Sequence, residues 1–397
     1  MDAEAYRGYC LENVAAAYDV VLITGTEPTW ERRFLTDWEV ADPTDQAALS
    51  TAGRALAARH QLAGVVTWTE WYLIPVARLA RQLGLPADPP EVMRACRNKA
   101  TSRTLFARHG VPSAASMTTR SLLEAALAAE TIGYPVVLKP ASRAASIGVI
   151  RADRAEELPA AWEFAAAGAS QDTKSPQVLV EEYLDGPEVS VECVTHRGTT
   201  SVVAVTRKTV SPPPFFEEMA HSVDAADPLL TTVAPAATAA IKALGITDGV
   251  SHVEMRLVDD RPRLIEVNGR IAGDMIGHLV RLATGIDLPR AAADIACGRT
   301  PDLTPTQHQA AAIRLLYPDT SGVLADLRLD ETGEEPWLER VRFQRRPGDE
   351  VLLPQDGGDM FTARLGFLIT TAPTGDLAQA RAQAIQRRLA VSVAPLT

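Results

Sequence analysis

The chain has 397 residues, with 39 Lys or Arg against 50 Asp or Glu, so its formal net charge is −11. This acidic balance, without a dense block of Lys and Arg, argues against nucleic acid or an anionic membrane as partner, because both bind a positive face. The start is polar and no apolar run approaches the ~18 residues of a membrane helix, so we expect a cytoplasmic protein. The four cysteines form no Cys-x-x-Cys pair, so neither a disulfide framework nor a structural zinc site is expected.

The first ninety residues alternate short apolar runs with segments of helical spacing. The expected elements are strands at 20–23 and 64–67 and helices near 45–60 and 73–83. Such alternation is typical of an open parallel α/β layer. Gly and Pro residues from 84 to 90 mark a connector, and we place a domain boundary near residue 93.

The middle of the chain mixes helices with neighbouring strands, and the last hundred residues predict a small mixed α/β cap. The expected helices are 99–109, 228–244 and an amphipathic one near 376–391, and the expected strands include 250–258 and 263–269. The fold class is therefore α/β with α+β elements in the middle and at the end.

Polar side chains interrupt the buried strand that ends at Gly269. Because successive side chains of a strand alternate between its faces, Glu266, Asn268 and Arg270 are expected to point together. A short turn at 259–262 would form a hairpin that brings Glu254 beside Glu266. Two carboxylates and an amide oxygen repel unless a cation lies between them, and hard oxygen ligands suit Mg²⁺ or Mn²⁺. The alternative is a solvated acidic strand face.

A lysine stands at the end of another apolar strand and is followed by a loop of small residues. Lys139 would supply a point charge, and the loop from Ala141 to Gly148 would let backbone N–H groups approach phosphate oxygens. The loop lacks the Walker pattern G-x-x-x-x-G-K-[ST], and the alternative is an ordinary surface loop.

A third cluster is acidic and lies where the strand from Val178 runs out into a hinge at Tyr183 and Leu184. The backbone of such a hinge can pair with the edge of a purine. Glu188 opens the next strand and could accept hydrogen bonds from ribose hydroxyls. The alternative is an exposed acidic turn.

In this order the pieces resemble the ATP-grasp superfamily of carboxylate–amine ligases, over about residues 94–297. The motifs that carry the resemblance are Asn98-Lys99, Lys139 with its loop, Glu181-Glu-Tyr-Leu184, Glu188, Glu254 and Glu266-x-Asn268-x-Arg270. The resemblance implies a Rossmann-like domain at 1–93, an ATP-grasp domain at 94–300 with a mobile lid at 104–180, and a cap at 301–397 that completes the substrate region.

The resemblance also implies the roles of the site residues. For ATP, Lys99 and Lys139 hold the α- and β-phosphates, Ser142 and Ser146 lie in the covering loop, Glu181, Tyr183 and Leu184 frame the adenine, and Glu188 binds the ribose. For the reaction, Glu254, Glu266 and Asn268 ligate two Mg²⁺ ions, and Arg270, with Lys139, neutralises the transferred phosphoryl group.

Within the superfamily the chain is most similar to L-amino acid ligases of the bacilysin synthetase type, through segments 216–221 and 269–278. In those enzymes a Glu and a His three residues apart contact the amino acid substrate. This implies Glu218 and His221 as substrate residues, with Arg270 and Gly273 beside them. The alternative for His221 is a cap of the following helix.

The implied reaction forms an amide between two amino acids, giving a dipeptide or a γ-glutamyl-type product, through an acyl phosphate with release of ADP and phosphate. The setting would be bacterial specialised metabolism, with small-molecule partners and a homodimer. Two alternatives stay open: a biotin-carboxylase-like or purine-pathway-like enzyme that activates bicarbonate or formate, and a nucleotide-binding module without turnover.

Overall fold

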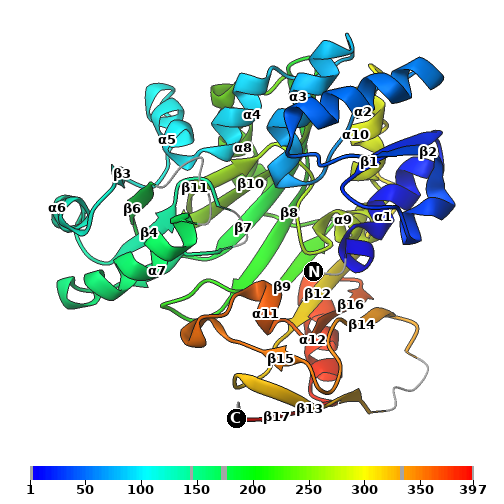
Figure 1. The fold of residues 1–397 in the computed structure, drawn as a ribbon. Coiled ribbons are helices and arrows are strands. Elements are labelled where there is room, and N and C mark those ends of the chain that lie inside the picture. Colours follow the sequence, from blue (N-terminus) through cyan, green and yellow to red (C-terminus); the bar gives the residue numbers. More distant parts are fainter. Residues whose placement is uncertain (1–2, 144–145, 171–176, 331–334, 396–397) are drawn as a thin grey trace.

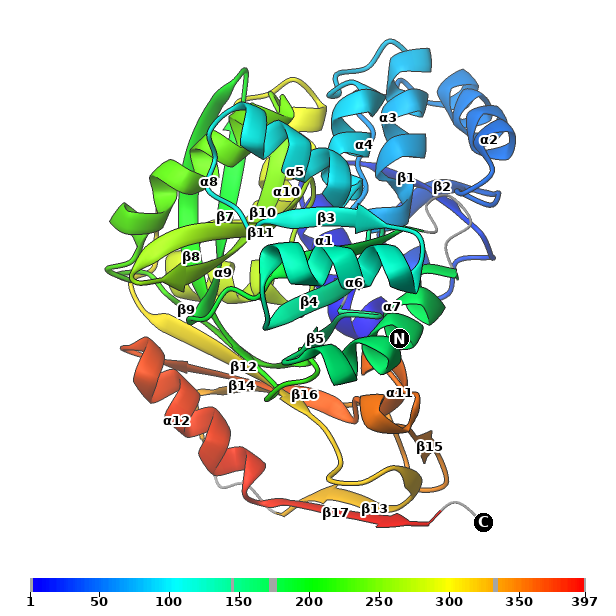
Figure 2. The ribbon, with the colours of Figure 1, turned by 90° about the vertical axis from the view of Figure 1, so that its left-hand side faces the viewer.

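The computed structural model describes residues 3–143, 146–170, 177–330 and 335–395. A long central sheet carries a helical N-terminal region, a smaller layer of sheet and helices, and a C-terminal region (Figures 1 and 2). The mixed α/β class that the sequence predicts is confirmed.

The N-terminal region is mostly helical. Its elements are α1 (Ala3–Ala15), β1 (Val20–Thr24), η1 (Trp30–Phe34), β2 (Leu35–Val40), α2 (Gln46–Arg59), η2 (Glu70–Tyr72), α3 (Leu73–Gln82) and α4 (Pro90–Arg97). Strands β1 and β2 pair in parallel, as expected. The expected strand at 64–67 is wrong, since these residues belong to no strand, and β2 is the partner instead. Asp45 caps α2 by accepting from the backbone N–H of Ala47.

The central sheet has the order β11-β10-β7-β8-β9-β12-β16-β14, and all of its neighbouring strands are antiparallel. Its strands are β7 (Glu188–His196), β8 (Thr199–Val210), β9 (Glu218–Asp224), β10 (Gly249–Val258), β11 (Arg261–Asn268), β12 (Ala310–Leu316), β14 (Leu338–Phe343) and β16 (Gly366–Ala372). Helices α8 (Leu230–Leu244), α9 (Ile276–Thr284) and α10 (Leu288–Ala296) pack against it.

The pleat of β10 divides its side chains between two cores. Val253 and Met255 belong to the core that contains Ile241 of α8. Val250, on the alternate register, belongs to the core formed with α9, α10 and α1. The even-numbered positions that follow Val250 therefore share its face, and this face carries Glu254.

The smaller layer lies beside the β10–β11 edge. Its elements are α5 (Lys99–Arg108), β3 (Ser116–Thr119), α6 (Leu122–Ile132), β4 (Val136–Pro140), β5 (Ile150–Ala152), η3 (Ala155–Glu157), α7 (Leu158–Ser170) and β6 (Val178–Glu182). The strands form an antiparallel sheet in the order β3-β6-β4-β5. Val136, Leu138 and Val180 pack with alanines of α6 and α7, so the alternating Lys139 and Glu181 are turned to the other face.

Strands β12, β14 and β16 of the C-terminal region continue the central sheet. The other elements of this region are β13 (Gly322–Leu329), β15 (Glu350–Val351), η4 (Pro354–Asp356), α11 (Met360–Ala363), α12 (Gly375–Gln386) and β17 (Leu389–Ala394). Strands β15, β13 and β17 form a small second sheet. The expected helix at 376–391 is too long, since its last residues are the start of β17, which pairs with β13.

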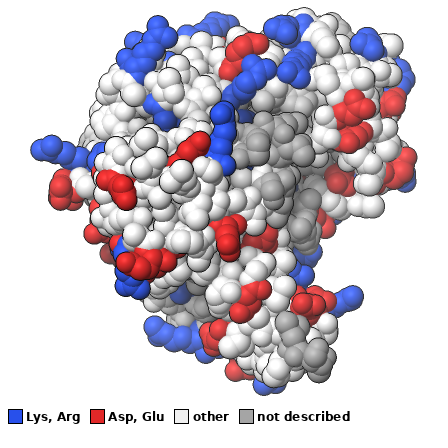
Figure 3. Space-filling view, turned by 60° about the vertical axis from the view of Figure 1, so that its left-hand side comes forward, with Lys and Arg blue, Asp and Glu red and all other residues white. Residues whose placement is uncertain are grey.

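Acidic and basic side chains are interspersed on the face shown in Figure 3. Among the described residues, no helix is long and apolar enough to cross a membrane. Cys10, Cys96 and Cys193 are buried free thiols, as expected for small hydrophobic side chains.

Candidate active site

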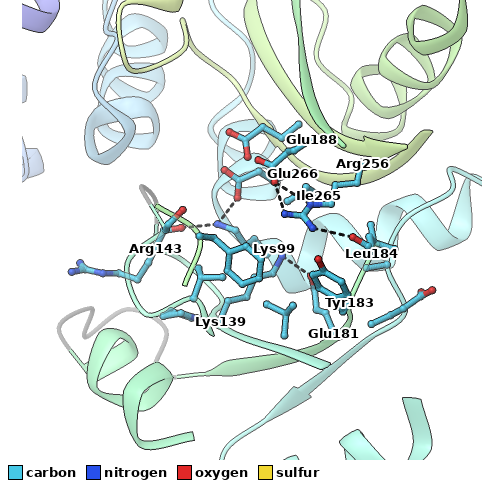
Figure 4. Close-up of a pocket in the computed structure, with 18 of the residues that line it drawn as sticks. Lys99, Lys139, Arg143, Glu181, Tyr183, Leu184, Glu188, Arg256, Ile265 and Glu266 are labelled. Atoms are coloured by element: carbon cyan, nitrogen blue, oxygen red, sulfur yellow. Dashed lines mark hydrogen bonds and ion pairs between the residues drawn. The ribbon is translucent and has the colours of Figure 1, made fainter. Parts of the chain in front are cut away.

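A cavity lies between the smaller sheet and the β10–β11 edge of the central sheet (Figure 4). It brings together ten of the residues that the sequence assigns to the site. They are Lys99, Lys139, Ser146, Glu181, Tyr183, Leu184, Glu188, Glu218, Glu254 and Glu266. The cavity is therefore the place to test the predicted chemistry.

The β10–β11 hairpin carries the predicted metal ligands. Glu254 lies directly opposite Glu266 in the antiparallel register, as the strand alternation predicts. Their side chains are 18% and 15% exposed, so a solvated strand face is excluded. The side-chain amide of Asn268 donates to Glu266 Oε1 over 2.9 Å.

Three cationic groups of the chain hold these two carboxylates. Lys99 Nζ is 2.6 Å from Glu266 Oε2 and His252 Nε2 is 2.8 Å from Glu254 Oε1, while Lys208 Nζ is 3.4 Å from the same Glu254 oxygen. Burial alone would raise the pKa of Glu254, but Lys208 and His252 outweigh it and hold this pKa well below its usual range. Both carboxylates are therefore ionised at neutral pH.

The donor set fits a hard divalent cation. Within the part of the chain that the structure describes, three or more His, Cys, Asp or Glu side chains do not gather into a metal-binding group. The hairpin offers two carboxylates and one amide oxygen, and water or phosphate oxygens would complete the shell of Mg²⁺. Binding of Mg²⁺ here would therefore depend on a bound phosphate, and Mg²⁺ sites in proteins are commonly completed by substrate phosphates.

Helix α5 begins at the site and positions Lys99. The side chain of Asn98 caps the helix by accepting from the N–H of Thr101, and the backbone N–H of Lys99 donates to the carbonyl of Ala141. Lys99 Nζ also donates to the carbonyl of Arg143 over 2.6 Å. The helix start thus ties Lys99 to both the hairpin and the loop after β4.

A buried ion-pair cluster lies deeper in the cavity. Glu181 Oε2 is 2.5 Å from Lys139 Nζ, and Arg103 approaches the same carboxylate at 2.8 Å. Burial alone would raise the pKa of Glu181, but Arg103 and Lys139 outweigh it and lower this pKa to about 2. The pKa of Lys139 is lowered, chiefly by burial. Glu181 opposes this shift, and the positive charges of Arg103 and Lys99 add to it. Arg103 and Lys139 share the single carboxylate of Glu181, which leaves positive charge for an anionic ligand.

The predicted hinge is buried rather than an exposed acidic turn. Leu184 is 5% exposed, and its carbonyl accepts from Arg256 over 3.0 Å. The guanidinium of Arg151 lies 4.1 Å from the ring centroid of Tyr183. Arg256 also binds Glu188, whose carboxylate contacts Lys208 as well. The expected ribose acceptor is thus already held by two cations.

Lys208 is the main site residue that the sequence reading missed. Its side chain is 2% exposed and contacts three carboxylates, at 2.6 Å to Glu218, 3.2 Å to Glu188 and 3.4 Å to Glu254. Burial lowers the pKa of Lys208, but these carboxylates outweigh it and raise the pKa well above its usual value. The sequence of β8 does not single it out, because Arg207 and Thr209 flank it.

Arg270 does not share the strand of Glu266, which corrects the expected alternation. Strand β11 ends at Asn268, because the chain there leaves the sheet for the loop that leads to α9. Arg270 Nε instead donates to Glu70 Oε2 over 2.7 Å, and Arg97 approaches the same carboxylate at 3.6 Å. Glu70 belongs to the N-terminal region and had no signal in the sequence.

Besides Arg270, four expected residues that the structure describes are not among those that line the cavity, namely Ser142, His221, Asn268 and Gly273. The carbonyl of Ser142 accepts from Arg97, and the carbonyl of Gly273 accepts from the N–H of Ile276. Ser146 reaches the cavity with a positive φ of 55°. Residues 144–145 of the predicted phosphate loop lie outside the described residues.

Glu218 and His221 lie on strand β9, and His221 does not cap a helix. His221 is 1% exposed, with Nε2 3.3 Å from Asp274 Oδ2 and 3.8 Å from Glu218 Oε2. Asp274 is in turn paired with Arg364 of the C-terminal region at 2.6 Å. This second charged cluster adjoins the cavity at Glu218.

Comparison with known protein families identifies three segments. Residues 18–87 match the ATP-grasp N-terminal domain, 132–278 the ATP-grasp domain and 314–394 the L-amino acid ligase C-terminal domain 2. The chain belongs to the ATP-grasp superfamily. The resemblance that the motifs carry is thereby confirmed.

Relatives of this ATP-grasp protein include amino acid ligases. Protein y4rH of Sinorhizobium fredii is 29% identical over 90% of this chain and 73% of its own length. Alanine–anticapsin ligase of Bacillus amyloliquefaciens is 27% identical, and the match covers 60% of this chain and 55% of that enzyme. The structure of L-amino acid ligase from Bacillus licheniformis has the same fold, with a TM-score of 0.82 at 23% identity, covering 97% of this chain and 95% of that one.

Proposed function

We propose that the protein is an ATP-dependent ligase that joins two amino acids through an acyl phosphate and releases ADP and phosphate. The observation that carries the proposal is the facing pair Glu254 and Glu266, with Lys99 and Lys139 lining the same cavity. The match of residues 314–394 to an amino acid ligase domain supports the choice of substrates.

The reaction needs activation because a carboxylate is a poor electrophile at neutral pH. Attack of the substrate carboxylate on the γ-phosphorus of ATP gives the acyl phosphate and ADP, and an amine then displaces phosphate. The amine loses a proton as the amide forms. The chain acts by positioning and electrostatics, and no side chain needs to become covalently attached.

ATP-grasp enzymes use ATP and Mg²⁺. We assign Glu254, Glu266 and Asn268 to Mg²⁺, which supplies positive charge to the phosphate oxygens; the expectation of two ions is part of this proposal. The pair of Lys139 and Arg103 supports phosphate binding, because two cations share the single carboxylate of Glu181, and Lys99 lines the same cavity.

The amine half of the reaction is assigned to the Glu218 end of the cavity. Glu218 and His221 face each other there, and Glu218 Oε2 has no hydrogen-bond partner in the described structure. A carboxylate in this position suits the ammonium group of an incoming amino acid. We assign Arg270 to the activated carboxylate, which it would reach by exchanging its contact with Glu70.

The decisive experiment is a screen of amino acid pairs for ADP and phosphate release, followed by mass analysis of the product. The proposal predicts release that needs two amino acids and a product mass equal to their sum minus water. Release that depends on bicarbonate or formate instead would favour the alternative ATP-grasp chemistry. Nucleotide binding without turnover in any combination would indicate a binding module.

A further inference from the structure

Arg364 is the most deeply buried charged side chain of the C-terminal region that the structure describes. It follows α11, is 1% exposed at its side chain, and pairs with Asp274 through Nη1–Oδ1 at 2.6 Å and Nη2–Oδ2 at 3.4 Å. It also donates to the hydroxyls of Tyr317 at 3.2 Å and Tyr6 at 3.4 Å. Residues from both ends of the chain thus converge on one guanidinium.

Asp274 is held in an unusual backbone conformation. Its φ is 46° and that of Met275 is 61°, in the left-handed region that residues other than glycine rarely adopt. Such strain persists only where surrounding contacts fix it, and it concentrates at functional sites. Burial raises the pKa of Asp274, but Arg364 and His221 outweigh it and hold this pKa well below its usual range. Asp274 therefore stays charged and fixed.

Two routes connect Arg364 to Glu218 at the cavity. In the first, Asp274 Oδ2 contacts His221 Nε2 at 3.3 Å, and the same nitrogen is 3.8 Å from Glu218 Oε2. In the second, the hydroxyl of Tyr317 donates to the backbone carbonyl of Glu218 over 3.0 Å. Arg364 thus holds the backbone of this end of β9 through Tyr317, and through Asp274 it places His221 beside the side chain of Glu218.

We propose that Arg364 is a positioning residue for the amine-accepting half of the reaction. It orients Asp274 and Tyr317, and through them Glu218 and His221, toward the ammonium group of the second substrate. The inference rests on the proposed function and extends it, because it makes the C-terminal region part of the acceptor site. The described contacts of Arg364 lead to this end and not directly to Lys99, Lys139 or the metal hairpin.

Hydroxylamine separates the two halves of the reaction. It is a small nucleophile that is largely uncharged near neutral pH, and it converts an acyl phosphate to a hydroxamate without needing an ammonium site. For Arg364→Met we expect kcat/KM for the amino acid acceptor to fall on the order of tenfold to a hundredfold, since small misplacements of reacting groups have such effects. Hydroxamate formation and the KM for ATP should change by less than about twofold.

A second variant distinguishes a loss of acceptor use from misfolding. Removal of Arg364 alone leaves Asp274 buried without its partner, so the double variant Asp274→Asn/Arg364→Met removes both charges. It should show the same selective loss of acceptor use. Arg364→Lys keeps the charge but loses the two-pronged contact with Asp274 and the Nε donor to Tyr317, and an intermediate loss is expected.

Arg290→Met is the matched control, because Arg290 also binds a buried aspartate, Asp294, at 2.9 Å, but on α10. It should leave both assays unchanged. Equal loss of hydroxamate and amide in the Arg364 variants, or full acceptor use by the double variant, would overturn the inference. Failure of the wild-type protein to form any hydroxamate from ATP and an amino acid would instead count against the proposed function.

Discussion

The two ends of the cavity are built in different ways. At the metal end, Glu254 and Glu266 face each other on one hairpin, and the balancing cations Lys99 and Lys208 come from the chain itself. At the amine end, His221 and Asp274 are 53 residues apart in sequence, and Asp274 and Arg364 are 90 apart. At the first end the carboxylate pair itself is local, although Lys99 and Lys208 come from other segments, and in the proposed reaction a metal would take the place of these cations. At the second end the charged residues come from β9, the loop before α9 and the C-terminal region, and Arg364 is a permanent partner.

The largest expected effect tests the metal end. Glu266→Gln should abolish amino-acid-dependent ADP release, by on the order of 10³-fold or more, because it removes one of the two carboxylates that would bind Mg²⁺. The fold should persist, since Gln keeps the shape and can still accept from Asn268. ADP release and circular dichroism of the variant provide the check, and wild-type-like turnover would refute the metal assignment.

Arg270 is paired with Glu70 outside the cavity lining, and its variant tests whether it takes part in the reaction. Arg270→Ala should lower turnover on the order of 10²-fold, because charge on the transferred phosphoryl group is left uncompensated. Nucleotide affinity should change far less. Parallel measurement of kcat and of ADP binding decides this point, and an equal loss of both would reduce Arg270 to a binding residue.

The ion pair of Arg103 and Glu181 shows whether the charges of the nucleotide end also stabilise the fold. Arg103→Met should lower the free energy of unfolding by about 3 kcal/mol, because it leaves a carboxylate that is only 4% exposed with one cation fewer. Arg154→Met is the control, since Arg154 is 69% exposed in its pair with Glu157 and should matter little. Urea unfolding curves compare the two, and similar midpoints would contradict the expectation.

The smallest effect concerns Glu217, beside the amine end. Burial raises its pKa to about 7, with Arg364 opposing this shift. The folded state therefore binds this proton more tightly than the unfolded state, and wild-type stability is lost as the pH rises from about 4.5 to about 7. Glu217→Gln avoids that loss and should be more stable than the wild type by about 1–3 kcal/mol at pH 8, but not at pH 4.

Melting temperatures at several pH values measure this difference. Glu163→Gln, on the exposed side of α7, serves as the control and should show no such trend. A Glu217→Gln difference that is constant with pH would show that Glu217 stays ionised in the folded protein.

Much of the metal and nucleotide end followed from local rules. Strand alternation and a short turn predicted the pairing of Glu254 with Glu266, and Lys139 was expected at the end of its strand. Local rules failed where the sheet ended: Arg270 was placed on a strand that stops at Asn268. They also missed β9, because its polar residues Glu218 and His221 hide the alternation of a buried strand.

The sequence by itself determined the α/β class, the facing carboxylates and the place of Lys139 at the end of its strand, because these depend on spacing within one hairpin or strand. Only the tertiary structure decided that Lys208 is shared by three carboxylates, that Glu70 holds Arg270, and that Arg364 holds Asp274. Such contacts depend on which strands become neighbours in the sheet and on how the two ends of the chain pack over it. Buried charges must find partners wherever the packing brings them, and spacing along the chain does not encode that choice.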